Sequence, residues 1–275
     1  MLSTETLPAA IEQIAKKLPP FPSVVLKLLD MLRDEDASLE VLTRHARNDP
    51  VITSGILATA NRLRRMNAQP DLHDPFVAAS LIGITQVQRI VVTAAMNKFM
   101  AEDKGAEFLL NHSRAVAIVA QELAAICGVS TEQAYVAGIL HDIGQLCFHI
   151  MDAKRFQDVY LKSAKDGRLT DWETAAFGVD HTEIGSALAV HWKLPEEFIS
   201  SIRNHHNDTA VTSKLQAVIN LAESLARALD LPKSPKNRVT RLNLKAVEEL
   251  GIDWNTPEII DCFGRCRARY QYAVQ

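Results

Sequence analysis

Residues 137–144 read Ala-Gly-Ile-Leu-His-Asp-Ile-Gly, and this stretch decides how the rest of the chain is interpreted. His141 and Asp142 lie beside the apolar stripe of a predicted helix. Adjacent helix positions diverge by about 100°, and two ligands can still share an ion that sits between them. A glycine inside a helix costs about 1 kcal/mol against alanine, so Gly138 and Gly144 predict a close approach. They either leave room beside the pair for something other than a side chain or serve tight helix packing.

Outside this stretch, almost every segment repeats its apolar residues with the helical period, so we expect an all-α fold in two helical subdomains. A charged break at residues 102–105 separates an amino-terminal subdomain, 1–103, from a second one, 104–230. A basic loop and a last helix fill 231–275. The absence of a βαβ rhythm and of a glycine-rich phosphate loop argues against Rossmann or P-loop nucleotide binding. The expected helices are 24–32, 39–48, 50–65, two between 75 and 100, 108–127, 131–150, a shorter pair to 177, 182–192, 195–206, 212–229 and one from 257.

Other histidines fall where the helical period turns them inward. His112 is in line with three apolar residues of its helix, and alone it is best interpreted as a core histidine. His181 begins an apolar stripe, and His205 and His206 end another. Glu223 flanks an apolar helix face, and alone it is best interpreted as a solvated carboxylate. Together with the His-Asp pair, these side chains form a ligand set that suits iron, manganese or zinc.

Composition excludes several classes of protein. The 275 residues are 47% apolar and 23% charged, with a net charge of −3. Those values exclude a disordered tail, a collagen-like chain and a disulfide-stapled mini-protein. No run of 18 apolar residues and no signal peptide occurs, so no membrane role is expected. The four cysteines are few and irregular, which predicts free thiols in the cytoplasm. Cys262 and Cys266 are four residues apart, but two thiols alone do not make a zinc site.

The run from Ala137 to Gly144 resembles the signature of the HD superfamily of metal-dependent phosphohydrolases. In that superfamily an upstream histidine, the His-Asp pair and a downstream aspartate hold a metal. The resemblance assigns these places to His112, His141, Asp142 and Glu223. His181 and His205 or His206 resemble extra ligands of the related HD-GYP phosphodiesterases, which hold two or three metals.

Further motifs narrow the resemblance to the HDOD domain, the HD-related output domain of bacterial signalling proteins. It covers roughly residues 10–230 and implies an HD-type helical bundle in the second subdomain. HDOD domains commonly lack part of the metal set and act mostly as signalling or scaffolding modules. The length of this chain leads us to expect a stand-alone member. The shared motifs are Leu18-Pro19-Pro20-Phe21-Pro22, Asn48-Asp49-Pro50, Ala58 to Arg62, Glu173, Phe177-Gly178, Asp180-His181, Gly185, Leu194-Pro195-Glu196 and His205-His206.

Three departures from the HD-GYP pattern bear on activity. Gln145 stands where active HD-GYP enzymes carry a lysine, which removes a cation that stabilises phosphate. No Gly-Tyr-Pro follows His206. Glu223 replaces the usual aspartate and moves the carboxylate by one methylene group.

Two hypotheses follow. The favoured one is a signal-transduction protein that acts by binding a partner protein, with or without a bound metal. The alternative is a metal-dependent phosphohydrolase, a phosphodiesterase in which Asp142 also orients the attacking water and the ligand is a phosphoester. Its divalent metal would be iron, manganese or zinc. The candidate metal ligands are His112, His141, Asp142, His181, His205, His206 and Glu223.

Nucleic-acid binding is a weaker third hypothesis. Five positive charges fall between Lys233 and Lys245 with no acid among them, at Lys233, Lys236, Arg238, Arg241 and Lys245. The negative net charge and the lack of interleaved aromatic residues favour a solvated loop instead.

Overall fold

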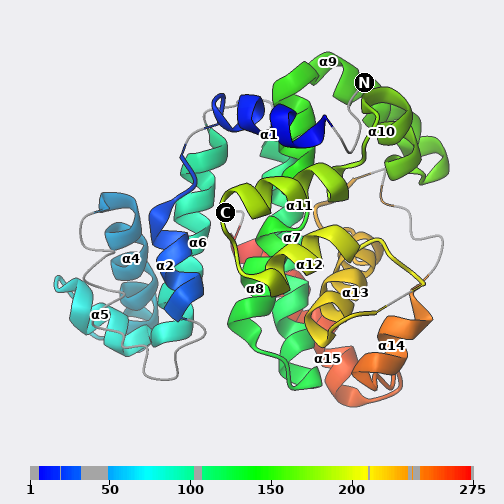
Figure 1. Cartoon of the computed structure of the whole chain (residues 1–275). Helices are drawn as coiled ribbons and strands as arrows, with labels where there is room; N and C mark the ends of the chain where they lie inside the picture. The colour runs from blue at the N-terminus through cyan, green and yellow to red at the C-terminus, as the bar shows by residue number, and fades with distance from the viewer. Residues whose placement is uncertain are drawn as a thin grey trace. The chain divides into compact units, whose positions relative to one another are not determined.

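The structure, a computed structural model, describes residues 6–18, 20–31, 49–101, 107–209, 211–234, 237 and 242–273. Every regular element in these ranges is an α-helix, and no strand occurs among them, which confirms the predicted all-α class (Figure 1). The contacts divide the chain into a small unit, residues 21–99, and a large unit, residues 1–20 with 100–275.

The small unit contains four described helices, α2 (Ser23–Met31), α4 (Pro50–Met66), α5 (Pro75–Ile82) and most of α6 (Ile84–Ala101). Asp49 caps α4, because its carboxylate accepts hydrogen bonds from the Val51 and Ile52 amides. Pro50 follows at the first helical position, where a missing N–H group costs nothing. These helices lie where the sequence predicts them, and the helix expected over 39–48 falls outside the described residues.

The large unit is built around α7 (Glu107–Cys127), whose residues from Ala115 to Ala124 are all buried. The helices α8, α13 and α15 pack against it, and α10, α11 and α12 extend the packing through α9 and α13. Its other helices are α1 (Leu7–Ala15), α8 (Thr131–Leu140), α9 (Ile143–Asp166), α10 (Leu169–Phe177), α11 (His181–His191), α12 (Glu196–Asn204), α13 (Lys214–Ala228), α14 (Leu244–Leu250) and α15 (Pro257–Ala273).

Two short helices, α1 and α14, lie in segments where the sequence predicts no helix. The amino-terminal α1 packs against α9 and α11, so it belongs to the large unit rather than with residues 21–99. The helix α14 contains Lys245, which had been assigned to a basic loop, and it packs against α13. Of the other basic residues of that loop, Lys233 is described, whereas Lys236, Arg238 and Arg241 lie outside the described residues.

The single helix expected over 131–150 is wrong, because the chain breaks at the His-Asp pair. His141 ends α8 in helical conformation, and Asp142, with φ −100° and ψ 17°, precedes the first residue of α9. One residue of changed backbone is too little to interrupt the apolar period, so the periodicity did not show the break. The break frees both side chains from the 100° separation that a continuous helix would impose.

Both glycines of the motif serve backbone contact, so the alternative of free space beside the pair is wrong. A Cβ atom on Gly138 would lie 2.5 Å from the Cα atom of Ala117 in α7. One on Gly144 would lie 2.0 Å from the carbonyl oxygen of His181 and 2.9 Å from the amide of Gly185. The start of α9 therefore touches the start of α11 directly, and this contact brings Asp142 and His181 together.

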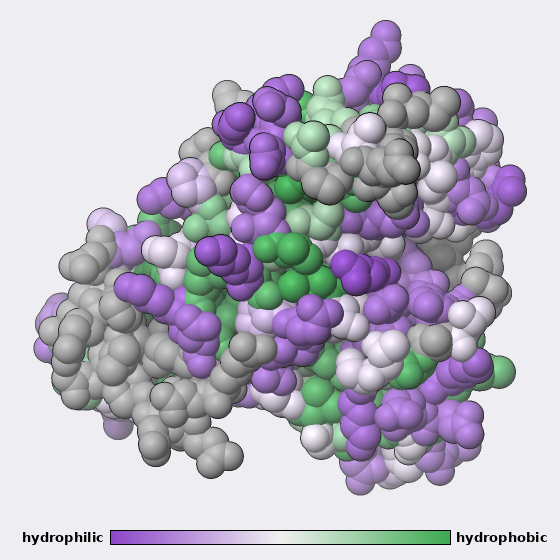
Figure 2. Space-filling view, viewed as in Figure 1, coloured by the Kyte–Doolittle hydropathy of each residue, from purple (hydrophilic) through white to green (hydrophobic). Residues whose placement is uncertain are grey.

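No single described helix is long and apolar enough to cross a membrane. The helices α5 and α6 reach the necessary length only as a pair, and the pair is bent by 114° between them. On the face drawn in Figure 2, hydrophilic and hydrophobic residues are interspersed.

We predict that Gly144→Ala lowers the free energy of unfolding by about 1–3 kcal/mol, because the added methyl group forces α9 away from α11. The matched control is Gly264→Ala in α15, where a Cβ atom would meet nothing within 4 Å. That change should be neutral or stabilise by up to about 1 kcal/mol through helix propensity. Urea unfolding measures both, and equal effects of the two substitutions would contradict the packing role of Gly144.

A buried carboxylate fastens α15 to α7. Glu122 accepts a hydrogen bond from Arg265 Nε at 2.6 Å and is paired with Arg269. Burial alone would raise the pKa of Glu122, but the hydrogen bonds from the two arginines lower it. The pair therefore stabilises the fold at neutral pH, and that contribution disappears as the pH falls through the lowered pKa.

We predict that Glu122→Gln lowers the free energy of unfolding by about 1–2 kcal/mol at pH 7, a value reduced by the partial exposure of both arginines. The difference from the unsubstituted chain should shrink as the pH falls from 5 to 3. Urea unfolding across that range tests the prediction, and a difference that stays constant would contradict it.

Candidate metal centre

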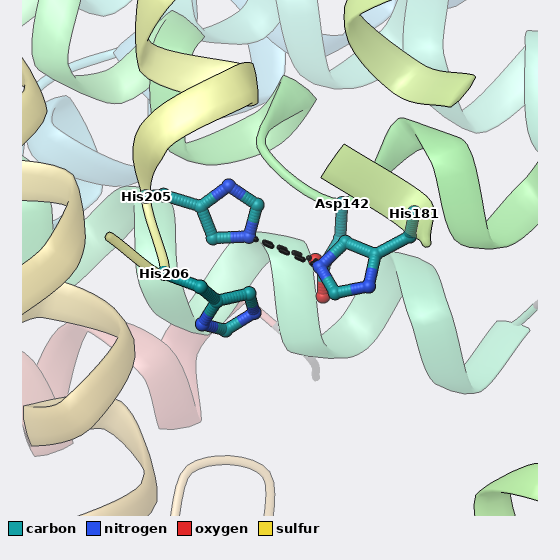
Figure 3. Close-up of side chains that lie close together, drawn as sticks. All are labelled: Asp142, His181, His205 and His206. Atoms are coloured by element: carbon teal, nitrogen blue, oxygen red, sulfur yellow. Dashed lines mark hydrogen bonds and ion pairs between the residues drawn. The ribbon is translucent and has the colours of Figure 1, made fainter. Parts of the chain in front are cut away.

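Seven titratable side chains of the large unit converge on one region and form two groups whose ligand atoms lie within 4.8 Å of one another. The first group joins the α8–α9 junction to the start of α11 and the end of α12 (Figure 3). The second joins α7, the end of α8 and α13. The first group is Asp142, His181, His205 and His206, and the second is His112, His141 and Glu223.

Asp142 connects the two groups, because its two carboxylate oxygens face different ones. Oδ1 lies 3.2 Å from His181 Nε2 and 3.4 Å from His205 Nε2. Oδ2 lies 3.3 Å from His141 Nε2 and 3.6 Å from His112 Nε2. The side chain is almost fully buried. Asp142 is therefore placed to bridge two ligand sets.

Backbone carbonyls fix the tautomers of two imidazoles. The Nδ1 atoms of His141 and His205 lie 2.8 Å from the carbonyl oxygens of Gly138 and Ile202, respectively. A carbonyl oxygen only accepts, so each Nδ1 donates its proton, and a neutral ring then presents an unprotonated Nε2. Both Nε2 atoms face Asp142.

A buried carboxylate does the same for His181. Glu173, on α10, is fully buried, and its Oε2 accepts hydrogen bonds from His181 Nδ1 at 2.6 Å and from the His181 amide at 3.0 Å. The ring is therefore held with Nε2 directed at Asp142. Such a carboxylate–histidine pair orients metal-ligating imidazoles in many proteins and strengthens their basicity.

The resulting donor set fits a divalent cation. His181 Nε2 and His205 Nε2 are only 3.2 Å apart, and both nitrogens face the same carboxylate oxygen. Lone pairs this close repel one another unless a proton or a metal ion lies among them. Among the described residues, His141 Nε2 and Asp142 Oδ1 are buried without a hydrogen-bond partner. Buried polar atoms of this kind require a partner, and a cation bound in each group would supply one.

The electrostatics of the site also favour a cation. Burial opposes charging of His141, yet the Asp142 and Glu223 carboxylates raise its pKa to about 10. Burial likewise opposes charging of His181, whose pKa Glu173 and Asp142 raise to about 9. The same negative field that holds a proton here would hold a metal ion.

Glu223 is the carboxylate of the second group. Its Oε2 lies 2.7 Å from His112 Nε2 and 3.3 Å from His141 Nε2, and its Oε1 pairs with Arg227 one helical turn later. Burial alone would raise the pKa of Glu223, but the charge of Arg227 and the hydrogen bond with His112 hold it well below its usual range. Glu223 is thus ionised and oriented.

The structure brings all seven predicted side chains together. His112 is only partly buried and lies within the second group, with His141 and Glu223, and Glu223 is not a solvated edge carboxylate, since it is buried. Two supporting side chains, Arg227 and Glu173, are not predicted from the residue pattern. Arg227 follows Glu223 at the i, i+4 spacing of a helical ion pair, which was a usable signal. Glu173 matched an HDOD motif, but no spacing rule linked it to His181.

The comparisons with known proteins agree with this architecture. Residues 18–208 match the HDOD domain family. The chain is similar to an HDOD domain protein of unknown function from Geobacter sulfurreducens, with 22% identity, 99% of this chain and 98% of that chain covered, and a TM-score of 0.75. A Shewanella amazonensis SB2B protein whose name proposes a phosphohydrolase is 25% identical, with 95% and 98% covered and a TM-score of 0.68.

A shorter match joins the chain to ribonuclease Y of Enterococcus faecalis. The two are 31% identical over 150 residues, which are 53% of this chain and 24% of that protein. The chain spans 40% or less of the length of the curated relatives that it matches first. The family match covers most of the chain, and with the helical architecture it leads to one conclusion: the chain belongs to the HDOD domain family.

Proposed function

We propose that the seven clustered side chains hold divalent metal ions and that the protein is a metal-dependent phosphohydrolase acting on phosphodiesters. The observation that carries the proposal is the crowding of the Nε2 atoms of His181 and His205 around Asp142 Oδ1, which is buried without a hydrogen-bond partner. A scaffold has no need of such an arrangement, and its electrostatic cost is offset only when a cation binds.

The two groups would hold separate ions, with Asp142 contributing one oxygen to each. Imidazole nitrogens with carboxylate oxygens suit iron, manganese or zinc. A bound metal lowers the pKa of a coordinated water and neutralises charge on a phosphoryl group. Glu173 keeps His181 in the ligating tautomer, and Arg227 keeps Glu223 ionised and oriented.

The relatives support the phosphoester class. Ribonuclease Y and the Shewanella protein are named for phosphoester hydrolysis, and each is similar to this chain at 25% identity or more. Gln145, which replaces a lysine of the HD-GYP pattern, is buried at the start of α9. A cation is instead present at Arg227, which pairs with Glu223.

A regulatory role through a protein partner is the second candidate function. The observation that favours it lies in the small unit, where α4 and α5 expose large hydrophobic side chains by between 38% and 76%. These residues are Val51, Leu63, Met66, Phe76, Val77 and Leu81. A Phe76→Ser, Val77→Ser double variant should retain metal content and hydrolysis while reproducing the phenotype of a strain that lacks the protein.

We predict that protein purified without chelators contains about one or two equivalents of iron, manganese or zinc, and that it hydrolyses bis(p-nitrophenyl) phosphate. Asp142→Asn should lower metal content at least tenfold and abolish turnover, because it removes the charge shared by both groups. Elemental analysis and release of p-nitrophenolate measure the two effects.

The matched control is Asp261→Asn, which changes an exposed aspartate of α15 outside the cluster. It should leave metal content and turnover unchanged. Less than about one-tenth equivalent of metal in the unsubstituted protein would refute the metal centre, since a site of this kind retains its ion through purification. Full metal content without hydrolysis would instead favour the regulatory role.

A further inference from the structure

A pocket of about 670 Å³ opens beside the metal centre in the large unit. Its walls come from α7, α9, α13 and the segment that follows α13. The α9 helix bends at Asp152, so His149 before the bend and Lys154 after it both face the pocket. The other lining residues are Phe108, Asn111, His112, Ala153, Phe156, Gln157, Tyr160, Arg227, Pro232, Lys233, Ser234 and Asn237.

The charged side chains that line the pocket favour an anionic ligand. Lys154, Arg227 and Lys233 line it, and no aspartate or glutamate occurs among its lining residues. The chain as a whole has a net charge of −3, so this local excess of cations differs from the average of the molecule. Lysine and arginine are the side chains that bind phosphate, and of these three cations Arg227 also pairs with Glu223.

Aromatic rings form another part of the wall. Phe108 is stacked against Phe156 at 6.5 Å between centroids and lies 5.3 Å from the ring of Tyr160. Phe108 keeps 39% of its surface exposed, so ring surface is available to a ligand. Exposed aromatic surface next to cations suits a planar, electron-rich group such as a nucleobase.

Two residues belong both to the pocket and to the ligand cluster. His112 lines the pocket and contacts Glu223, and Arg227 lines it and pairs with the same carboxylate. The pocket therefore adjoins the ligand cluster on the side of Glu223. The volume is within the range of pockets that take small organic ligands and cofactors.

We propose that this pocket binds a nucleoside phosphate group, with the base on Phe108 and the phosphate among Lys154, Lys233 and Arg227. This proposal names the substrate class of the metal centre, and in that respect it rests on the proposed function. Binding of the nucleotide itself needs no metal. The group can come from a free nucleotide or from the end of a nucleic-acid chain, and the chemistry recognised is the same.

The test is calorimetric titration of the full chain in EDTA with the four nucleoside 5′-monophosphates, with ribose 5-phosphate and with the corresponding nucleosides. At least one nucleotide should bind about tenfold more tightly than either of its parts. Phe108→Ala and Lys233→Ala should each weaken that nucleotide about fivefold or more. The matched controls, Tyr272→Ala on the exposed face of α15 and Lys214→Ala at the start of α13, should change its affinity less than twofold.

A short oligoribonucleotide serves as a further arm. Tighter binding of the oligomer than of the mononucleotide would assign the group to a chain end, and equal binding would assign it to a free nucleotide. The proposal fails if no nucleotide binds below roughly 5 mM, if ribose 5-phosphate binds as well as the nucleotide, or if the control variants weaken binding equally. Metal-dependent hydrolysis without nucleotide binding would refute only this pocket, and binding without hydrolysis would refute only the phosphohydrolase.

Discussion

The carboxylate of Asp142 has each of its oxygens directed at a different set of imidazoles. One oxygen faces His181 and His205, and the other faces His141 and His112. This placement needs a break in the chain immediately before α9, and it needs α9 to approach α11 at backbone distance. Gly144 permits that approach, because any side chain there would overlap the carbonyl group of His181. The close backbone contact between Gly144 and His181 thus holds the Asp142 carboxylate in place.

Three of the five imidazoles of the cluster are held in one arrangement by their surroundings. Gly138 and Ile202 accept the Nδ1 protons of His141 and His205 through their carbonyl oxygens, and Glu173 accepts that of His181. The donors are therefore set before any ligand arrives, so binding loses little side-chain entropy. Such preorganisation is expected of a ligand-binding centre, and it argues against a purely structural role for the cluster.

The sequence predicted much of this because the helical period reports which side chains face inward. From this period we predict that the side chains of His112, His181 and His205 point toward the core, and the structure places them there. It missed the break at Asp142, since His141 keeps helical dihedral angles and the apolar pattern continues across the junction. It gave no role to Glu173, because the contact with His181 spans a helix end rather than one face. Lys245 was assigned to a loop because a seven-residue helix such as α14 carries too few periods to detect.

The ligand residues come from segments spread widely along the chain. His112 and Glu223 touch although 111 positions separate them. Because the chain is synthesised from its amino terminus, the ribosome must complete most of the large unit, through Glu223 in α13, before the second group of ligands is present. A metal ion at the proposed second group would therefore be bound late in biosynthesis, and a polypeptide truncated before α13 would leave the ribosome with the His-Asp motif intact yet unable to complete that group.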